Sequence, residues 1–177
     1  MARQGRSGET KMEGELLALT YGAVVARVLK DYERTDEVNA QLDKMGYNIG
    51  VRIIDDFLAK NRHGRCKNMQ ETAEAIQSAF KQYINVQPQV GKWNDAQNSF
   101  SLTLDTNPLT SFVELPAELS RLYYCQLFCG IIRGALEMVQ LETKVQIVAD
   151  NLKGSNVTEI RISFVKKLVD ALPVGED

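Results

Sequence analysis

The sequence of 177 residues (19.9 kDa) is 44% hydrophobic and 25% charged, which suits one compact domain that buries about 70% of its unfolded surface without a metal ion or disulfide. Its 21 basic and 23 acidic residues give a net charge of −2, which excludes the strongly positive field of nucleic-acid-binding proteins. The single histidine, His63, excludes multi-histidine metal sites and leaves one imidazole for a hydrolytic triad.

The cysteines and the hydropathy pattern indicate the cellular compartment in which the protein is expected. Three cysteines with no apolar leader predict a reducing compartment. The most apolar stretch, Leu127 to Ile132, is followed at once by Arg133 and is far short of the ~20 residues that span a bilayer. We therefore expect a soluble cytoplasmic protein with a flexible N-terminal arm (residues 1–11) and a single domain (residues 12–177).

Apolar residues at helical spacing predict two long helices in the first third of the chain. The first runs from Glu13 to Tyr32, and the second runs from a cap at Thr35 to Lys60. Gly46 and Gly50 lower the helix propensity of the second, so we expect a bend or a close packing contact there.

A third helix and a first pair of strands follow. Asn68, with Glu71 three residues later, predicts a capping-box-like start for a helix that reaches Tyr83. The alternation of apolar and polar residues over 100–105 predicts a half-buried strand, and residues 90–93 are its expected hairpin partner.

The last third predicts one more helix and a second hairpin. The helix is expected from Glu118 or Ser120 to about Gln140, and the two strands from Lys144 to Asp150 and from Thr158 to Lys167. The element order helix-helix-helix-strand-strand-helix-strand-strand has no βαβ repetition. It favours the α+β class, with helices packed on small antiparallel hairpins.

Cys66 is the cysteine with the most unusual neighbours. Four basic residues surround it without an intervening acid, His63 is close, and a helix is predicted to start just after it. Both basic neighbours and a helix N-terminus lower the pKa of a thiol, because they stabilise the thiolate. The alternative is an inert side chain in a solvated basic loop, and both interpretations stay open. The basic residues are Lys60, Arg62, Arg65 and Lys67.

The other candidate groups have structural interpretations. Cys125 and Cys129 lie among apolar residues, so we expect core packing. Gly130 and Gly134 predict close approach of another element, although they could instead leave room for a slender apolar ligand. The paired acids Asp55-Asp56 and Glu71/Glu74 are expected on solvated helix faces.

Several long segments, in order, carry a resemblance to a known family. The chain closely resembles the Bet-three-type core subunit of the transport protein particle (TRAPP) complex from about Leu16 to its C-terminus. The segments are Leu19–Ala23, Leu42–Leu58, Gly64–Cys66, Phe112–Pro116, Gly130–Val139 and Val157–Arg161.

The resemblance implies an adaptor in a multisubunit complex. Such complexes act on transport vesicles between endoplasmic reticulum and Golgi and promote guanine-nucleotide exchange on a Rab-type GTPase. The implied subunit is cytoplasmic, lies at cis-Golgi and endoplasmic reticulum membranes through the complex, and dimerises through helices with related small subunits or with itself. The implied fold is α+β with an internal apolar channel.

The resemblance also implies a bound lipid. Family members carry palmitate as a thioester on the cysteine of a Gly-Arg-Cys motif, which is Cys66 here, and need no metal. We predict that Ala73 and Ala79 keep the channel open. The apolar faces of the first two helices, Leu16 to Leu29 and Ile49 to Leu58, are the predicted subunit interface. The acidic tail, 172–177, is either a GTPase contact or a frayed terminus.

Two other classes of function compete with the adaptor. An apolar channel also suits a stand-alone carrier of lipids or other small hydrophobic ligands. An enzyme would have to use His63 and Cys66 as a nucleophilic pair, but no third residue is identifiable to orient the histidine. Slow self-acylation of Cys66 is compatible with a non-catalytic subunit.

Overall fold

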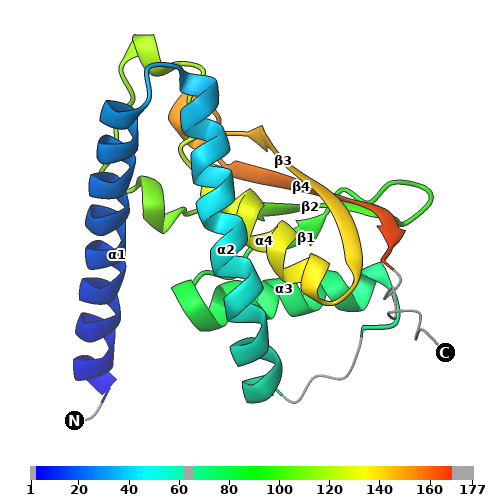
Figure 1. Ribbon diagram of the computed structural model, residues 1–177. Coiled ribbons are helices and arrows are strands. Elements are labelled where there is room, and N and C mark those ends of the chain that lie inside the picture. The colour runs from blue at the N-terminus through cyan, green and yellow to red at the C-terminus, as the bar shows by residue number, and fades with distance from the viewer. Residues whose placement is uncertain (1–2, 62–65, 169–177) are drawn as a thin grey trace, which may run out of the picture.

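The computed structural model describes residues 3–61 and 66–168, with the side chains of residues 3–13 excluded (Figure 1). Its elements follow the predicted order, and the α+β class is confirmed. Three short 3-10 turns, at residues 108–110, 117–119 and 151–153, join the longer elements. The helices are α1 (Arg3–Asp31), α2 (Thr35–Asn61), α3 (Met69–Ile84) and α4 (Gln126–Met138), and the strands are β1 (Gln89–Gly91), β2 (Ser99–Leu104), β3 (Leu141–Ala149) and β4 (Thr158–Lys167).

The two predicted hairpins join into one antiparallel sheet with strand order β1-β2-β4-β3. The join is the β2–β4 pair, in which Leu102 lies opposite Ile160 and Phe100 opposite Ile162. All four of these side chains are fully buried. The helical layer packs against the sheet, with α3 on β1 and β2 and α4 on β3.

The prediction of a half-buried strand was wrong for β2, because its polar residues Ser99 and Ser101 are buried as well. Arg161 of β4 covers that face, and its Nε donates to Ser101 Oγ at 2.7 Å.

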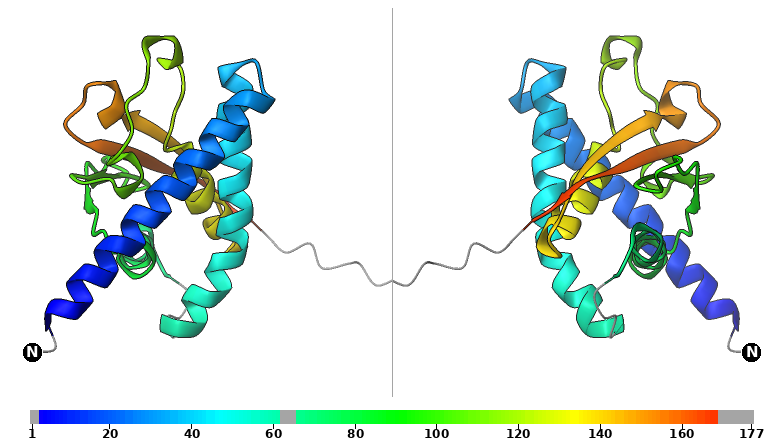
Figure 2. Two further views of the ribbon diagram at one scale, coloured as in Figure 1. Left: turned by 90° about the vertical axis from the view of Figure 1, so that its left-hand side faces the viewer. Right: turned by 90° about the vertical axis from the view of Figure 1, so that its right-hand side faces the viewer.

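The closest contact between elements is that of α2 with α4, which lie side by side in Figures 1 and 2. Gly46 and Gly50 of α2 face Gly130 and Gly134 of α4. A Cβ atom at any of the four would lie within 3.0 Å of a main-chain oxygen of the facing helix. The prediction of close packing is confirmed, and these glycines serve backbone contact instead of leaving room for a ligand.

Polar groups lock the same helix pair. Arg133 of α4 forms an ion pair with Asp43 of α2, and Gln126 Nε2 donates to the other oxygen of Asp43 at 3.1 Å. The guanidinium of Arg133 also lies 5.3 Å from the centre of the Tyr47 ring. These contacts help to fix the register of the two helices.

The predicted start of the last long helix was wrong, because α4 begins at Gln126. Asn39 of α2 holds the preceding segment: its Nδ2 donates to the carbonyl of Arg121 at 3.0 Å, and its Oδ1 accepts the N–H of Tyr123 at 2.8 Å. These two main-chain groups are thereby withheld from a helical hydrogen-bond ladder.

The start of the first helix also differs, because α1 begins at Arg3 within the segment expected to be a flexible arm. Helix propagation adds one hydrogen bond for each residue fixed, and the sequence before Gly14 contains no proline to stop it. The division of the chain into an arm and a domain stays a prediction.

The start of α3 is as predicted. The side chain of Asn68 accepts the N–H of Glu71 at 2.9 Å, and the carboxylate of Glu71 accepts the N–H of Lys67 at 2.8 Å. Reciprocal bonds of this kind satisfy main-chain donors at a helix N-terminus.

Substitution of Gly130 tests the α2–α4 contact. We expect Gly130→Ala to lower the free energy of unfolding by about 2 kcal/mol or more, because the new methyl group overlaps the Asp43 carbonyl. Gly14→Ala is the matched control: it lies in a helix with no atom within 4 Å of the new Cβ, so it should be neutral or stabilising. Equal changes for both variants in chemical denaturation would contradict the contact.

Candidate functional site

An apolar cavity of about 690 Å³ lies between α2, α3, α4 and the ends of β3 and β4. Aliphatic and aromatic side chains form most of its wall. From α2 these are residues of the C-terminal half of the helix, from Ile49 onward. The chief apolar wall residues are Ile49, Ile53, Ile54, Phe57, Leu58, Ile76, Phe80, Ile84, Leu127, Phe128, Ile131, Ile132, Leu136 and Val139.

Small side chains explain why this space is not filled. Ala75 and Ala79 of α3 and Ala135 of α4 all line the cavity. Each contributes one side-chain carbon where most core positions contribute three or more, so the facing helices cannot close the gap. The cavity agrees with the internal apolar channel that the family resemblance implies.

The two alanines predicted to line a channel have different places. Ala79 lies in the wall, whereas Ala73 is fully buried in the core and does not line the cavity. The wall residues of α3 include Thr72, Ile76 and Ala79, which recur at intervals of three and four along one helix face. Ala73 lies on the same side of α3 as the wall residue Phe80, seven residues later, but core residues cover its methyl group completely and it does not reach the cavity.

Cys66 lines the same cavity although it is exposed, so it lies at an opening of the cavity. The expected lowering of its thiol pKa was wrong. Partial burial raises the pKa of Cys66 above its ordinary value, the negative charge of Glu71 raises it further, and a hydrogen bond with Thr72 acts in the opposite direction. Arg62, His63 and Arg65, on which the expectation partly rested, lie outside the described residues.

Sequence reasoning missed the polar bridge between the two helices that flank the cavity. Asp56 of α2 accepts hydrogen bonds from Tyr83 Oη of α3 at 2.5 Å and from Lys60 Nζ at 2.8 Å. The pKa of Asp56 is lowered by these hydrogen bonds, from Lys60 first and then Tyr83. Burial and the bond to Asp56 raise the pKa of Tyr83 to about 12. Asn61 and Gln82 form a second bridge at 2.8 Å.

The remaining candidate groups are structural. Cys125 and Cys129 are fully buried, and burial raises the pKa of both thiols to about 12, which agrees with the predicted core packing. Over residues 3–61 and 66–168, no three histidine, cysteine, aspartate or glutamate side chains gather as a metal ion would require. No helix within those ranges is long and apolar enough to cross a bilayer.

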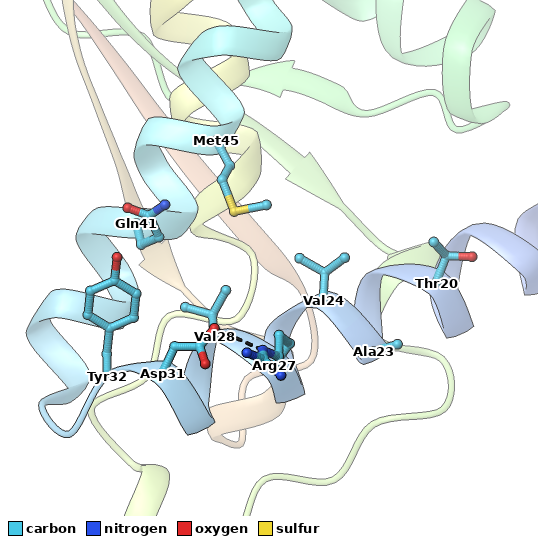
Figure 3. Close-up of a pocket in the computed structure, with 9 residues that line it drawn as sticks. All are labelled: Thr20, Ala23, Val24, Arg27, Val28, Asp31, Tyr32, Gln41 and Met45. Carbon is cyan, nitrogen blue, oxygen red and sulfur yellow. Dashed lines mark hydrogen bonds and ion pairs between the residues drawn. The ribbon is translucent and has the colours of Figure 1, made fainter.

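A second hollow lies on the surface between α1 and α2, which diverge from their shared turn (Figure 2). Figure 3 shows Val24 and Val28 of α1 facing it together with Met45 of α2. On the same helix as these valines, Leu16 and Leu19 are 66% and 62% exposed.

The first part of the predicted subunit interface, Leu16 to Leu29, lies at this surface. The second part, Ile49 to Leu58, supplies side chains to the wall of the cavity instead, because these residues face α3 and α4.

A family model described as "Transport protein particle (TRAPP) component" matches residues 17–163. The chain belongs to this TRAPP component family. It is 46% identical to trafficking protein particle complex subunit 3 of Dictyostelium discoideum, over 94% of this chain and 91% of the relative. It is 45% identical to trafficking protein particle complex subunit BET3 of Saccharomyces cerevisiae, over 94% of this chain and 88% of the relative. The predicted family is confirmed.

A solved structure of a relative has the same fold. The crystal structure of a trafficking protein particle complex subunit 3 from Naegleria fowleri, covalently bound to palmitic acid, aligns with a TM-score of 0.86 and 41% identity. The alignment covers 90% of this chain and 99% of that one. The family and the fold make this chain a TRAPP component that functions in trafficking.

Proposed function

We propose that this chain is a non-catalytic core subunit of a TRAPP complex and that Cys66 carries a palmitoyl group as a thioester within the cavity. The observation that carries the proposal is the presence of the Cys66 thiol in the lining of the apolar cavity. The covalently bound palmitic acid of the N. fowleri relative supports it.

The volume and chemistry of the cavity suit a long hydrocarbon chain. An apolar cavity of about 150 Å³ accommodates one benzene molecule, so a sixteen-carbon chain requires about 400 Å³ at the same density. The cavity of about 690 Å³ exceeds this. Burial of such a chain from water is favourable by roughly 0.8 kcal/mol per methylene, on the order of 10 kcal/mol in total. The chain would complete the core and shield the thioester from hydrolysis.

The surface between α1 and α2 is the proposed contact with a related small TRAPP subunit, or with a second copy when the chain is isolated. Its support is the exposure of Leu16 and Leu19 beside an apolar hollow, because monomeric surfaces rarely expose such a patch. Through the complex, the subunit would support vesicle tethering and Rab guanine-nucleotide exchange at cis-Golgi and endoplasmic reticulum membranes. The tail at residues 172–177, proposed to contact the GTPase, lies outside the described residues.

A stand-alone lipid carrier is the second candidate, because the cavity opens at the exposed Cys66. The two functions differ in how the lipid is held: a thioester is permanent until cleaved, whereas a carrier must exchange its lipid.

Intact mass spectrometry tests the thioester. We expect the purified chain to carry a stoichiometric palmitoyl adduct that hydroxylamine removes, because hydroxylamine cleaves thioesters. Cys66→Ser should lose the adduct, whereas Cys129→Ala, which removes a buried thiol outside the cavity wall, should keep it. Free lipid that exchanges with added fatty acid, with no covalent adduct, would favour the carrier and contradict the proposal.

Enlargement of Ala79 tests the cavity. We expect Ala79→Leu to reduce the acylated fraction several-fold and to shrink the rise in melting temperature that acylation causes, because the larger side chain takes up cavity volume. Ala59→Leu, at an exposed position of the wall helix α2, is the matched control and should change neither quantity. Unchanged acylation and thermal stability in Ala79→Leu would rule out this place for the lipid.

Sedimentation at micromolar concentration tests the subunit surface. We expect the isolated chain to be dimeric and Leu19→Glu to weaken the dimer by at least tenfold, because a charge would be buried in an apolar contact. Val148→Glu, at a similarly exposed apolar position on β3, should leave the dimer intact. A monomer in the unmodified chain, or equal weakening by both substitutions, would contradict the proposed interface.

A further inference from the structure

The hydroxyl of Thr72 lies beside the Cys66 thiol in the cavity wall. Thr72 is in the first turn of α3, is only 3% exposed and lines the cavity together with Cys66. Its side chain acts to lower the pKa of the thiol. Its Oγ1 donates to the carbonyl oxygen of Asn68 at 3.0 Å. Because the Thr72 hydroxyl donates its hydrogen bond to Asn68, its oxygen can only accept a hydrogen bond from the S–H of the neutral thiol.

The geometry allows this hydroxyl to change partner at small cost. The carbonyl oxygen of Asn68 accepts a second hydrogen bond, from the N–H of Thr72 at 3.2 Å. It therefore keeps a partner when the hydroxyl turns away. The first helical turn of α3 does not depend on this hydroxyl, because the side chain of Asn68 accepts the N–H of Glu71 at 2.9 Å.

The change of partner is useful only when the sulfur is ionised. A thiolate can accept hydrogen bonds but cannot donate one, so a hydroxyl that turns toward it stabilises the negative charge. Burial and the charge of Glu71 both disfavour the thiolate at this place. The Thr72 hydroxyl opposes them, and the thiolate is the form that attacks a carbonyl carbon.

Two other polar side chains of the wall, Tyr83 and Lys167, are engaged elsewhere or exposed. The hydroxyl of Tyr83 donates to Asp56 at 2.5 Å, and Lys167 is exposed at the end of β4. Lys67, next in sequence to the thiol, has its N–H bonded to Glu71. Among the described residues, Glu71 and Thr72 are thus the side chains whose charge or hydrogen bonding acts on the thiol.

We propose that Thr72 is a positioning residue for acylation of Cys66, its hydroxyl turning from the Asn68 carbonyl to the sulfur and stabilising the attacking thiolate. The proposal rests on the proposed function, in which Cys66 receives an acyl group. The acyl donor is a long-chain acyl thioester of coenzyme A. A bond forms between Cys66 Sγ and the acyl carbonyl carbon, the bond from that carbon to the coenzyme A sulfur breaks, and the proton lost by Cys66 passes to the departing thiolate.

The test compares Thr72→Val, which keeps the shape but removes the hydroxyl, with Thr72→Ser, which keeps the hydroxyl. Two rates are measured on the full chain across pH: self-acylation by palmitoyl-coenzyme A and alkylation of Cys66 by iodoacetamide. We expect Thr72→Val to slow both about tenfold at pH 7, as loss of one hydrogen bond to a charged group would. The midpoint of the alkylation profile should rise by about one pH unit. Thr72→Ser should restore both rates.

The pH profile separates this role from a structural one. Above the thiol pKa the sulfur is ionised in every variant, so the Thr72→Val and unmodified rates should converge. An equal slowing at every pH, or slowing by Thr72→Ser as well, would indicate a packing role and overturn the proposal. Rates and midpoints that match the unmodified chain would overturn it too.

The two readouts also distinguish failure of the proposed function. One outcome is that palmitoyl-coenzyme A acylates neither the unmodified chain nor any variant, while the alkylation midpoint still depends on the hydroxyl. This outcome would contradict the acylation of Cys66 and therefore also a role of Thr72 in it. Only the stabilisation of the thiolate by Thr72 would then remain. If the unmodified chain is acylated and the hydroxyl affects neither midpoint nor rate, the palmitoyl function stands and the role of Thr72 is overturned.

Discussion

The structure depends on the contact between the backbones of α2 and α4. Four glycines remove the side chains that would keep the helices apart, and each would clash with the facing main chain if it carried a Cβ atom. Wall residues of the cavity alternate with these glycines along both helices, because Ile49 precedes Gly50 and Ile131 follows Gly130. The close backbone contact and the unfilled apolar space are thus formed by different faces of the same helix pair.

An empty cavity lowers the stability of the folded protein, and a bound hydrocarbon chain would offset this loss. Space inside a core forfeits dispersion contacts, and each cubic ångström of cavity costs about 24 cal/mol in core substitutions. A folded domain of this size has only about 5–15 kcal/mol of stability. On this scale an empty cavity of about 690 Å³ would cost as much as the whole stability of such a domain, and a bound hydrocarbon chain would remove that cost.

Local sequence patterns predicted the helices and strands well, but not how these elements pack against one another. The positions of the strands and the Asn68 cap follow from neighbouring residues, and both were confirmed. The burial of β2 on both faces depends on Arg161, which is distant in sequence, and was missed. The start of α4 was missed because it depends on Asn39, which is 82 residues from Arg121 in sequence. Ala73 and Ala79 are the same residue type, and only the packing around each of them in the fold decides which one lines the cavity. The thiol pKa of Cys66 was misjudged for the same reason, since its burial is a tertiary property.

The bridges from Asp56 to Tyr83 and from Asn61 to Gln82 have a consequence for access. These groups are solvent-exposed, so water can replace their hydrogen bonds with little loss of free energy. Separation of α2 from α3 on that side would leave no buried charge unpaired. It would also leave the glycine-mediated backbone contact between α2 and α4 undisturbed. A bulky hydrocarbon could thus enter from the side while the α2–α4 junction and the sheet remain intact.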